Sequence, residues 1–295
     1  MTGRRYDRQA HLATLDPVAD HWEIYQQLAT LEFPWDMRQA LGFALFRTYA
    51  VPSIGALLHE TREFGARVQK RYDDTALLLD AVLEHSMASA EGRTAVRRIN
   101  QMHGSYDISN DDLRYVLATF VVVPTRWLDR FGWRRLTEAE RTATAEYYRQ
   151  LGRHMGIRDL PADYAGFAAL LDAYEQEHFA FDPGGRAVAD ATVELLLTFP
   201  PTNRVPKRLS RWFVRGLLDA PLAAAFGYPT PGRLEAAVCG GAVKLRGRAV
   251  RRQPPRTTPV RTRDLPEIRS YPGGYRVEEL GTFPRCPVRH EETAS

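Results

Sequence analysis

The sequence predicts an all-α protein, a single-domain helical bundle that is globin-like in style, followed by an irregular, basic, Pro-rich C-terminal tail. Three observations predict it. Few stretches of five or more residues alternate between apolar and polar positions, so no central sheet is expected. Apolar positions recur instead with helical spacing between breaks at Pro and Gly. The 295 residues suffice for one substantial core, and no repeat of fixed period divides them.

The polar and apolar patterns divide the chain into three parts. Residues 1–22 are polar and are expected to form an N-terminal arm. Helical patterning begins at Glu23 and continues to about residue 248. Residues 249–295 contain many Pro and Arg residues and are expected to form the tail, draped on the domain or extending from it.

The first half of the domain is predicted to hold four helices. Pro34 marks the start of the first helix, because Pro is favoured at this position, where its missing N–H would have no partner within the helix. Pro52 separates the first helix from the second. The predicted helices are Trp35–Thr48, Ile54–Arg62, Arg67–Val82 and Glu91–Met102.

The central helix is predicted from a cap and an unusually apolar run. Ser109 stands three residues before Asp112, a spacing like that of a capping box. The segment Leu113–Val123 is apolar almost all round, which favours burial on every side. Pro124 is expected to end this helix or kink it, because Pro lacks the N–H that the helix needs.

The second half begins with a capping box, Thr137 and Glu140, which opens a helix to about Met155. Leu160-Pro161 follows that helix, and Pro200-Pro201 breaks the chain further on. The remaining predicted helices are Tyr164–Gln176, Ala187–Leu197, Leu209–Leu218, Pro221–Phe226 and Gly232–Gly240.

The net charge of +4 is unevenly spread. Lys244 to Arg263 carries eight Lys and Arg and no Asp or Glu. Such a run fits an anionic partner, either nucleic acid or an acidic membrane surface, but it is also typical of a solvated tail. No aromatic residue interleaves the basic ones, so no nucleic acid is expected. Peripheral membrane contact through the basic tail stays open.

The sequence contains no run of 18 apolar residues and no secretory signal, so neither a transmembrane segment nor export is expected. Two cysteines, Cys239 and Cys286, do not make a disulfide framework. We therefore expect a cytoplasmic location.

Common catalytic motifs are absent. There is no HExxH, CxxC, CxxCH, GxSxG, P-loop or GxGxxG pattern. The remaining candidate is His103, an imidazole at a predicted helix end beside Met102 and Ile99. A His in such surroundings is often an ordinary core residue, but a neutral imidazole in a dry pocket is also the usual axial ligand of haem iron.

Several long motifs resemble one family. They are RxNxxH, which ends at His103, ISNDDLxYxL from Ile108, and PxRWLDRxxWRxLTxxE from Pro124; LEFPWDMRQALGFALFRTYAVPSIGALL precedes them. Over roughly Leu28 to Tyr228 they resemble the MpaB/rubber-oxygenase (latex-clearing protein) family, and within it a bacterial-type soluble member of the MpaB-like branch. The resemblance implies that residues 23–248 are a catalytic domain.

The resemblance also implies an activity. Haem-b oxygenases of this family cleave C=C bonds of isoprenoid chains, so the expected activity is haem-b-dependent oxidation, with O2, of an apolar small molecule of isoprenoid or terpenoid type. His103 is then the expected ligand of the iron. Arg98 is expected to hold a haem propionate or to polarise oxygen, with Glu84 as its acidic catalytic partner and Arg93 as a second cofactor-binding residue.

One departure from the family pattern leaves alternatives open. In the rubber-oxygenase branch the axial His lies in the next helix, in the region that matches Tyr115–Thr119, and this chain has no His there. His85, His154 and His178 are therefore alternative ligands. A second hypothesis is a haem-free helical protein that binds an apolar ligand. Under either hypothesis, aromatic side chains are candidates to line an apolar channel: Phe43, Phe46, Tyr115, Phe120, Trp127 and Trp133.

Overall fold

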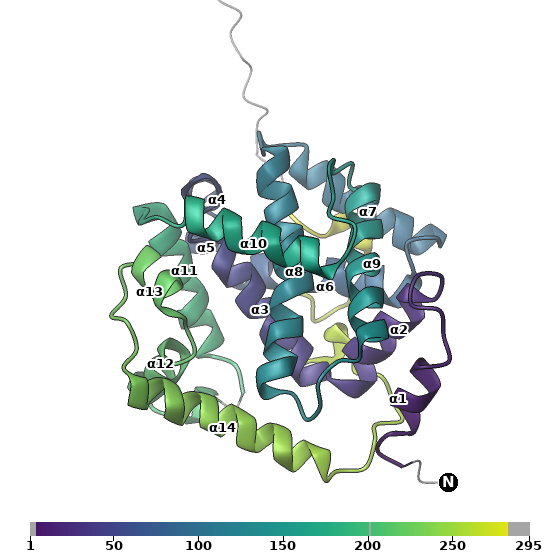
Figure 1. The fold of residues 1–295 in the computed structure, drawn as a ribbon. Coiled ribbons are helices and arrows are strands. Elements are labelled where there is room, and N and C mark those ends of the chain that lie inside the picture. The colour runs from purple at the N-terminus through teal and green to yellow at the C-terminus, as the bar shows by residue number, and fades with distance from the viewer. Residues whose placement is uncertain (1–3, 201, 283–295) are drawn as a thin grey trace, which may run out of the picture.

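The computed structural model of the chain describes residues 4–200 and 202–282. Within them it contains fourteen α-helices and no strand, which confirms the all-α prediction (Figure 1). The helices are α1 (Asp7–Leu12), α2 (His21–Gln27), α3 (Pro34–Thr48), α4 (Pro52–Glu60), α5 (Glu63–Ala66), α6 (Val68–His85), α7 (Ala90–His103), α8 (Asn110–Phe131), α9 (Glu138–His154), α10 (Tyr164–His178), α11 (Pro183–Leu196), α12 (Lys207–Arg215), α13 (Ala220–Ala225) and α14 (Arg233–Arg251).

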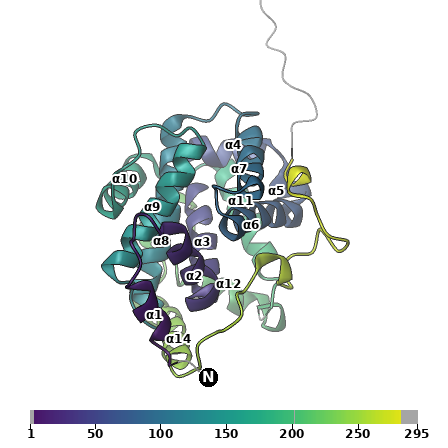
Figure 2. The same ribbon diagram turned by 90° about the vertical axis from the view of Figure 1, so that its right-hand side faces the viewer.

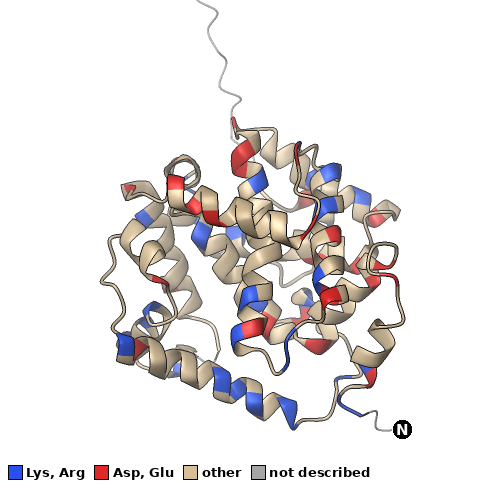
Figure 3. Cartoon of the chain, viewed as in Figure 1, with Lys and Arg blue, Asp and Glu red and all other residues tan. Residues whose placement is uncertain are grey.

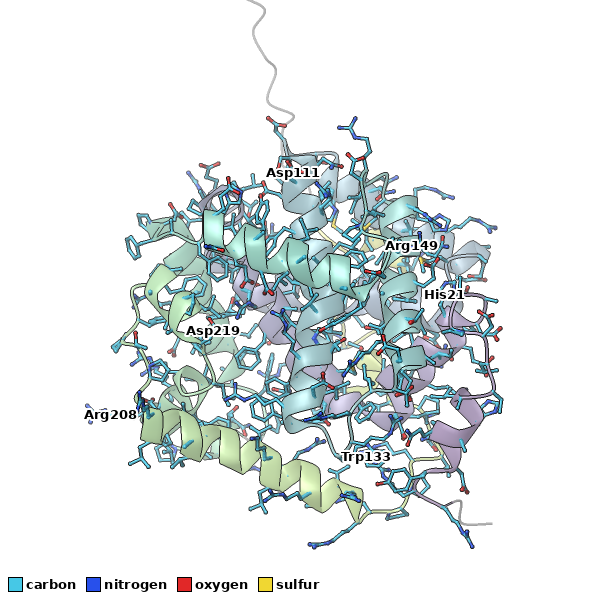
Figure 4. The ribbon with its side chains drawn as sticks, in the orientation of Figure 1. His21, Asp111, Trp133, Arg149, Arg208 and Asp219 are labelled. Carbon is cyan, nitrogen blue, oxygen red and sulfur yellow. The ribbon has the colours of Figure 1, made fainter. Side chains whose placement is uncertain are left out.

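Helix α8 is the central element, and α3, α9 and α10 pack around it (Figure 1). Asp111 and Trp133, near its two ends, lie at opposite ends of the molecule (Figure 4). Most side chains from Tyr115 to Leu128 are buried, as the apolar run predicts, while Arg126 and Arg130 are exposed. Pro124 lies inside the helix, so of the two alternatives expected at this residue, an end or a kink, the end is wrong. Because three helices pack against α8, burial outweighs the one backbone hydrogen bond that Pro124 cannot make.

Both predicted caps are present. The Ser109 hydroxyl accepts a hydrogen bond from the N–H of Asp112 at 3.0 Å. The Thr137 hydroxyl accepts from the N–H of Glu140 at 3.2 Å, and the Glu140 carboxylate accepts from the N–H of Thr137 at 2.8 Å. The sequence therefore fixes the start of α8 and α9 locally.

The N-terminal part of the chain contributes to the domain. Within the expected arm, residues 7–12 form α1, and Leu12 is buried in the main core. A second, smaller apolar cluster lies where the end of α3 meets α11 and α13, and it contains Phe46, Val188 and Phe226.

Helix α14 corrects the prediction for the basic stretch. It continues past Gly240 to Arg251, so residues 244–251 are helical rather than part of a tail. Arg246 pairs with the fully buried carboxylate of Asp36 in α3. The pair holds α14 against the bundle, and the glycines that suggested a break lie inside the helix.

The chain after α14 is an irregular strap, residues 260–281, that runs along α6 and α7 (Figure 2). Carboxylates of α6 hold its backbone. Asp80 accepts from the N–H of Thr262 at 3.2 Å, and Asp73 accepts from the N–H groups of Arg269 and Ser270 at 3.1 and 2.8 Å. The predicted tail is thus draped on the domain up to residue 281, while Cys286 lies outside the described residues.

No single helix in the described ranges is long and apolar enough to cross a membrane. Helices α3 and α4 meet the length and composition criteria only together, and they bend by 94° at the break between them.

Candidate functional site

The candidate site lies where the end of α7 meets α6. Ser89 caps the start of α7, accepting a hydrogen bond from the N–H of Gly92 at 2.9 Å. The apolar face of α7, with Ala95, Val96 and Ile99, packs against α6. This packing brings His103, the last residue of α7, near Arg71 in the first turn of α6.

The imidazole of His103 has the state expected of a metal ligand. Its Nδ1 atom is buried and has no hydrogen-bond partner among the described residues. Burial, and to a smaller degree the charge of Arg71, lower the pKa of His103 to about 4. The ring is therefore neutral near pH 7, with one nitrogen lone pair available.

Arg71 connects His103 with three further side chains. Its guanidinium donates to the hydroxyl of Thr75, one turn further along α6, and that hydroxyl donates to the Arg71 carbonyl at 2.9 Å. The guanidinium carbon lies 5.8 Å from the centre of the Phe64 ring, and that ring lies 5.5 Å from the ring of Tyr49. Burial raises the pKa of Tyr49, and the charge of Arg71 opposes the rise.

The strap covers this end of α7. A Cβ atom on Gly281 would lie 1.9 Å from the sulfur of Met102, so the strap backbone packs directly against the residue before His103. The carbonyl of Leu280 accepts a hydrogen bond from Nε of Arg98 at 2.6 Å. Arg98 is thus near the predicted site, and its Nε–H binds the strap.

The other predicted catalytic residue, Glu84, lies at the opposite end of α6. It is thirteen residues from Arg71, about 20 Å along the helix at 1.5 Å per residue. Its carboxylate pairs with Arg261 and Arg263 of the strap. Burial favours a higher pKa for Glu84, but hydrogen bonding and charge from Arg263, with Arg261, lower it. The structure therefore separates Glu84 from His103 and gives it a role in holding the strap.

Arg93 also lies away from His103. It is exposed near the start of α7, and its guanidinium donates to the carbonyl of Ala88. It borders an open pocket of about 200 Å³ together with Asn100 and His154. The structure therefore does not bring Arg93 together with His103.

The three alternative histidines differ from His103. Like His103, each is the last residue of a helix: His85 of α6, His154 of α9 and His178 of α10. His85 and His154 are exposed, and His178 stacks on Tyr174 with ring centres 4.1 Å apart. Among these four, His103 is the one with a buried nitrogen that lacks a partner.

The region that matches the family's axial His is tightly packed. Tyr115, Leu117 and Thr119 are buried in α8, and the hydroxyl of Tyr115 lies 3.2 Å from Glu175. The predicted aromatic candidates are likewise buried or half-buried among core residues.

His103 fits an axial ligand by its chemistry, because its half-buried ring is neutral near pH 7 and its Nδ1 atom is buried without a hydrogen-bond partner among the described residues. Among the described residues there is no cluster of three His, Cys, Asp or Glu suited to a bare metal ion. A haem iron needs only one protein donor, so a lone imidazole suffices for it.

Sequence reasoning missed Arg71, Thr75 and Tyr49. The one local signal was the four-residue spacing of Arg71 and Thr75, which places both on one helix face. The position of Arg71 and Thr75 relative to His103 depends on how α6 packs against α7, which no local sequence pattern indicates.

Comparisons with known proteins show which family the chain belongs to. Residues 35–252 match the family model described as ER-bound oxygenase mpaB/B'/Rubber oxygenase, catalytic domain. The chain is 34% identical over 230 residues to the ER-bound oxygenase mpaB' of Penicillium brevicompactum, covering 71% of this chain and 54% of that protein. It is 35% identical over 198 residues to the ER-bound oxygenase mpaB of Penicillium roqueforti (strain FM164), covering 61% of this chain and 66% of that protein.

The chain thus spans about half the length of the mpaB' relative. The matched range extends from α3 to the end of α14 and includes both helices of the candidate site. By this match, the chain belongs to the family of ER-bound oxygenase mpaB/B' and rubber oxygenase catalytic domains.

Proposed function

We propose that this chain is a haem-b-dependent oxygenase whose iron ligand is His103. The observation that supports the proposal is the neutral imidazole of His103 at the α6–α7 junction, whose buried Nδ1 atom has no hydrogen-bond partner among the described residues. The family match supports oxygenase chemistry in general. When bound, haem would supply the iron at which O2 is activated.

Each neighbouring residue has a proposed task. His103 offers a nitrogen lone pair without having to lose a proton near pH 7. Arg71 holds a positive charge near His103, where it stabilises negative charge that develops nearby. The rings of Phe64 and Tyr49 exclude water on the side of Arg71. Arg98 fixes the strap over the end of α7.

The proposed substrate is an apolar small molecule with a C=C bond in an isoprenoid or terpenoid chain, and oxidative cleavage of that bond is the proposed reaction. The resemblance to the rubber-oxygenase branch supports this substrate class, and the named family includes rubber oxygenase.

An absorption spectrum tests the cofactor and its ligand together. Wild type and His103→Ala are purified with haem supplied, beside His178→Ala as a matched control at another helix end. We expect a Soret band in wild type and in the control, and its loss or shift in His103→Ala. An unchanged band in His103→Ala would move the ligand to another residue. No band in any protein would reject haem.

A second candidate function is a haem-free protein that binds an apolar ligand. One observation favours it: the segment that holds the axial His in the rubber-oxygenase branch contains none here and is packed with core side chains. It predicts a colourless protein that carries a lipid through purification, which extraction and mass spectrometry would detect.

A further inference from the structure

Helix α14 presents an apolar face that no other part of the described chain covers. It lies along the lower edge of the molecule in Figure 1. Leu234, Val238 and Leu245 are 79%, 50% and 64% exposed. They are spaced by four and seven residues, which aligns them on one face of the helix.

The opposite face of α14 is firmly seated. Cys239, Val243 and Gly247 are buried against the bundle. A Cβ atom on Gly247 would lie 2.3 Å from the carbonyl oxygen of Phe131, so the two backbones touch. Together with the Arg246–Asp36 pair, this contact prevents a rotation that would bury the three aliphatic side chains. Their exposure is a fixed property of the fold.

Basic side chains flank the apolar face. Lys244, Arg248, Arg251 and Arg252 are exposed on α14 or just after it. Figure 3 shows several blue Lys and Arg segments along this helix. Residues 202–252 hold eleven Lys and Arg but two Asp and Glu, whereas the rest of the chain holds twenty-nine against thirty-four. The excess of positive charge therefore lies in the segment that contains α12 and α14.

Helix α12 extends the surface. It packs against α14, with Gly216 just after it close to Cys239. Leu209 and Trp212 are 52% and 37% exposed, and Arg208 lies at the edge of the molecule beside the start of α14 (Figure 4). An exposed Trp among basic residues is typical of a helix that lies at a membrane interface.

The charge pattern decides between possible occupants. A second copy of the chain in a two-fold dimer would place this basic surface against itself, where like charges repel. A nucleic acid would satisfy the basic residues but would leave the leucines without an apolar partner. An anionic bilayer surface satisfies both, because its headgroups pair with Lys and Arg while its acyl boundary buries the apolar side chains.

We propose that the outer face of α14, with Leu234, Val238 and Leu245 at its centre, docks the protein on an anionic lipid bilayer. The helix lies in the plane of the interface, and its nineteen residues give a contact about 28 Å long. Lys244 and Arg248 contact the headgroups. The inference does not depend on the proposed haem chemistry, because it rests on a surface away from His103.

Vesicle flotation of the full chain tests the docking. Two vesicle types are used, phosphatidylcholine alone and phosphatidylcholine with phosphatidylserine as about a third of the lipid. We expect flotation with the second type only, and a loss of binding as salt rises, because the Debye length shortens. The triple variant Leu234→Ser, Val238→Ser, Leu245→Ser should bind about tenfold more weakly or worse. Lys244→Ser and Arg248→Ser should each lose about fivefold.

A matched control is Phe181→Ser, which removes an apolar side chain that is 59% exposed elsewhere on the molecule and should leave flotation unchanged. All the replaced side chains are exposed, so thermal unfolding should match wild type in every variant. Absence of wild-type flotation with anionic vesicles would overturn the proposal, as would equal binding by the triple variant. A concentration-dependent dimer that the triple variant abolishes would assign the face to a second copy instead.

Discussion

Gly55 of α4 and Gly185 of α11 lie back to back, so that a Cβ atom on Gly55 would lie 2.7 Å from the Cα atom of Gly185. A Cβ atom on Gly185 would in turn lie 2.3 Å from the carbonyl oxygen of Tyr49. Backbone faces backbone at this crossing, so no side chain can move aside to admit a methyl group.

This crossing gives the first prediction. Gly185→Ala should lower the free energy of unfolding by about 1–3 kcal/mol, because α11 must move away from the carbonyl oxygen of Tyr49. Gly42→Ala is the control. No heavy atom lies within 4 Å of the added Cβ there, in the middle of α3, so it should raise the free energy of unfolding by about 0.5–1 kcal/mol. Urea denaturation measures the free energy of unfolding of both variants. Equal changes would contradict the close backbone packing at Gly185.

The second prediction concerns pH. The pKa of His103 is about 4 in the folded state and about 6.5 unfolded. Between these values the unfolded chain binds a proton that the folded chain does not, so the contribution to stability is complete above pH 6.5 and decreases as the pH falls toward 4. Through His103 alone, the free energy of unfolding should fall by about 1–3 kcal/mol over this pH range.

Urea denaturation at several pH values separates this share from that of other groups. His103→Leu should flatten the profile between pH 6.5 and 4. Arg71→Met should flatten it less, because it removes only the smaller cause of the low pKa. Parallel profiles for wild type and His103→Leu would show that this imidazole is not buried as described.

The third prediction compares a buried ion pair with an exposed one. Arg134 forms two 2.7 Å hydrogen bonds with Glu140 and one of 3.2 Å with Glu32, and all three side chains are buried. Arg126 makes the same two-bond pair with Asp172 at 2.7 Å, but both side chains are about half exposed. Arg134→Ala should cost about 3–5 kcal/mol, because it leaves the buried carboxylate of Glu140 without a cation, while Glu32 keeps its pair with Arg8 at 3.3 Å. Arg126→Ala should cost less than about 1 kcal/mol. Thermal or urea unfolding would contradict the assignment if the two costs were similar.

The fourth prediction concerns the strap. Asp73→Ala should remove the acceptor for two backbone N–H groups and destabilise the fold by about 2–4 kcal/mol. It should also speed limited proteolysis within residues 260–281. Asp264→Ala removes an exposed carboxylate of the strap itself. It should change neither the free energy of unfolding nor the rate of proteolysis by a measurable amount. Equal proteolysis rates in the two variants would mean that Asp73 does not hold the strap.

Local chemistry allowed the caps to be predicted from the sequence. Ser109 and Thr137 act on N–H groups within three residues, so a short window contains the whole interaction. The apolar pattern likewise indicated that α8 is buried. The helix end predicted at Gly240, and the end that was one of two alternatives at Pro124, were wrong, because tertiary packing holds both residues inside helices despite their local preference.

The candidate site was only partly accessible to sequence reasoning. His103 and Arg98 share one helix and one motif, and both lie near the site that the structure describes. Arg71 is 32 residues away from His103 in sequence, and the strap carbonyl that binds Arg98 is 182 residues away from it. Only the packed structure reveals such long-range contacts. Glu84 and Arg93 are closer to His103 in sequence than Arg71 is, but they lie away from it in the structure.

The strap also sets an order of events during synthesis. Ser270 bonds to Asp73 across 197 residues, so α6 emerges from the ribosome long before the backbone that its carboxylates will hold. Contacts of such sequence separation form late, because the long loop must first be closed. The end of α7 is therefore the last part of the domain to be covered. In a newly made chain, Met102 and Arg98 remain without their contacts to Gly281 and Leu280 until residues 260–281 settle along α6 and α7.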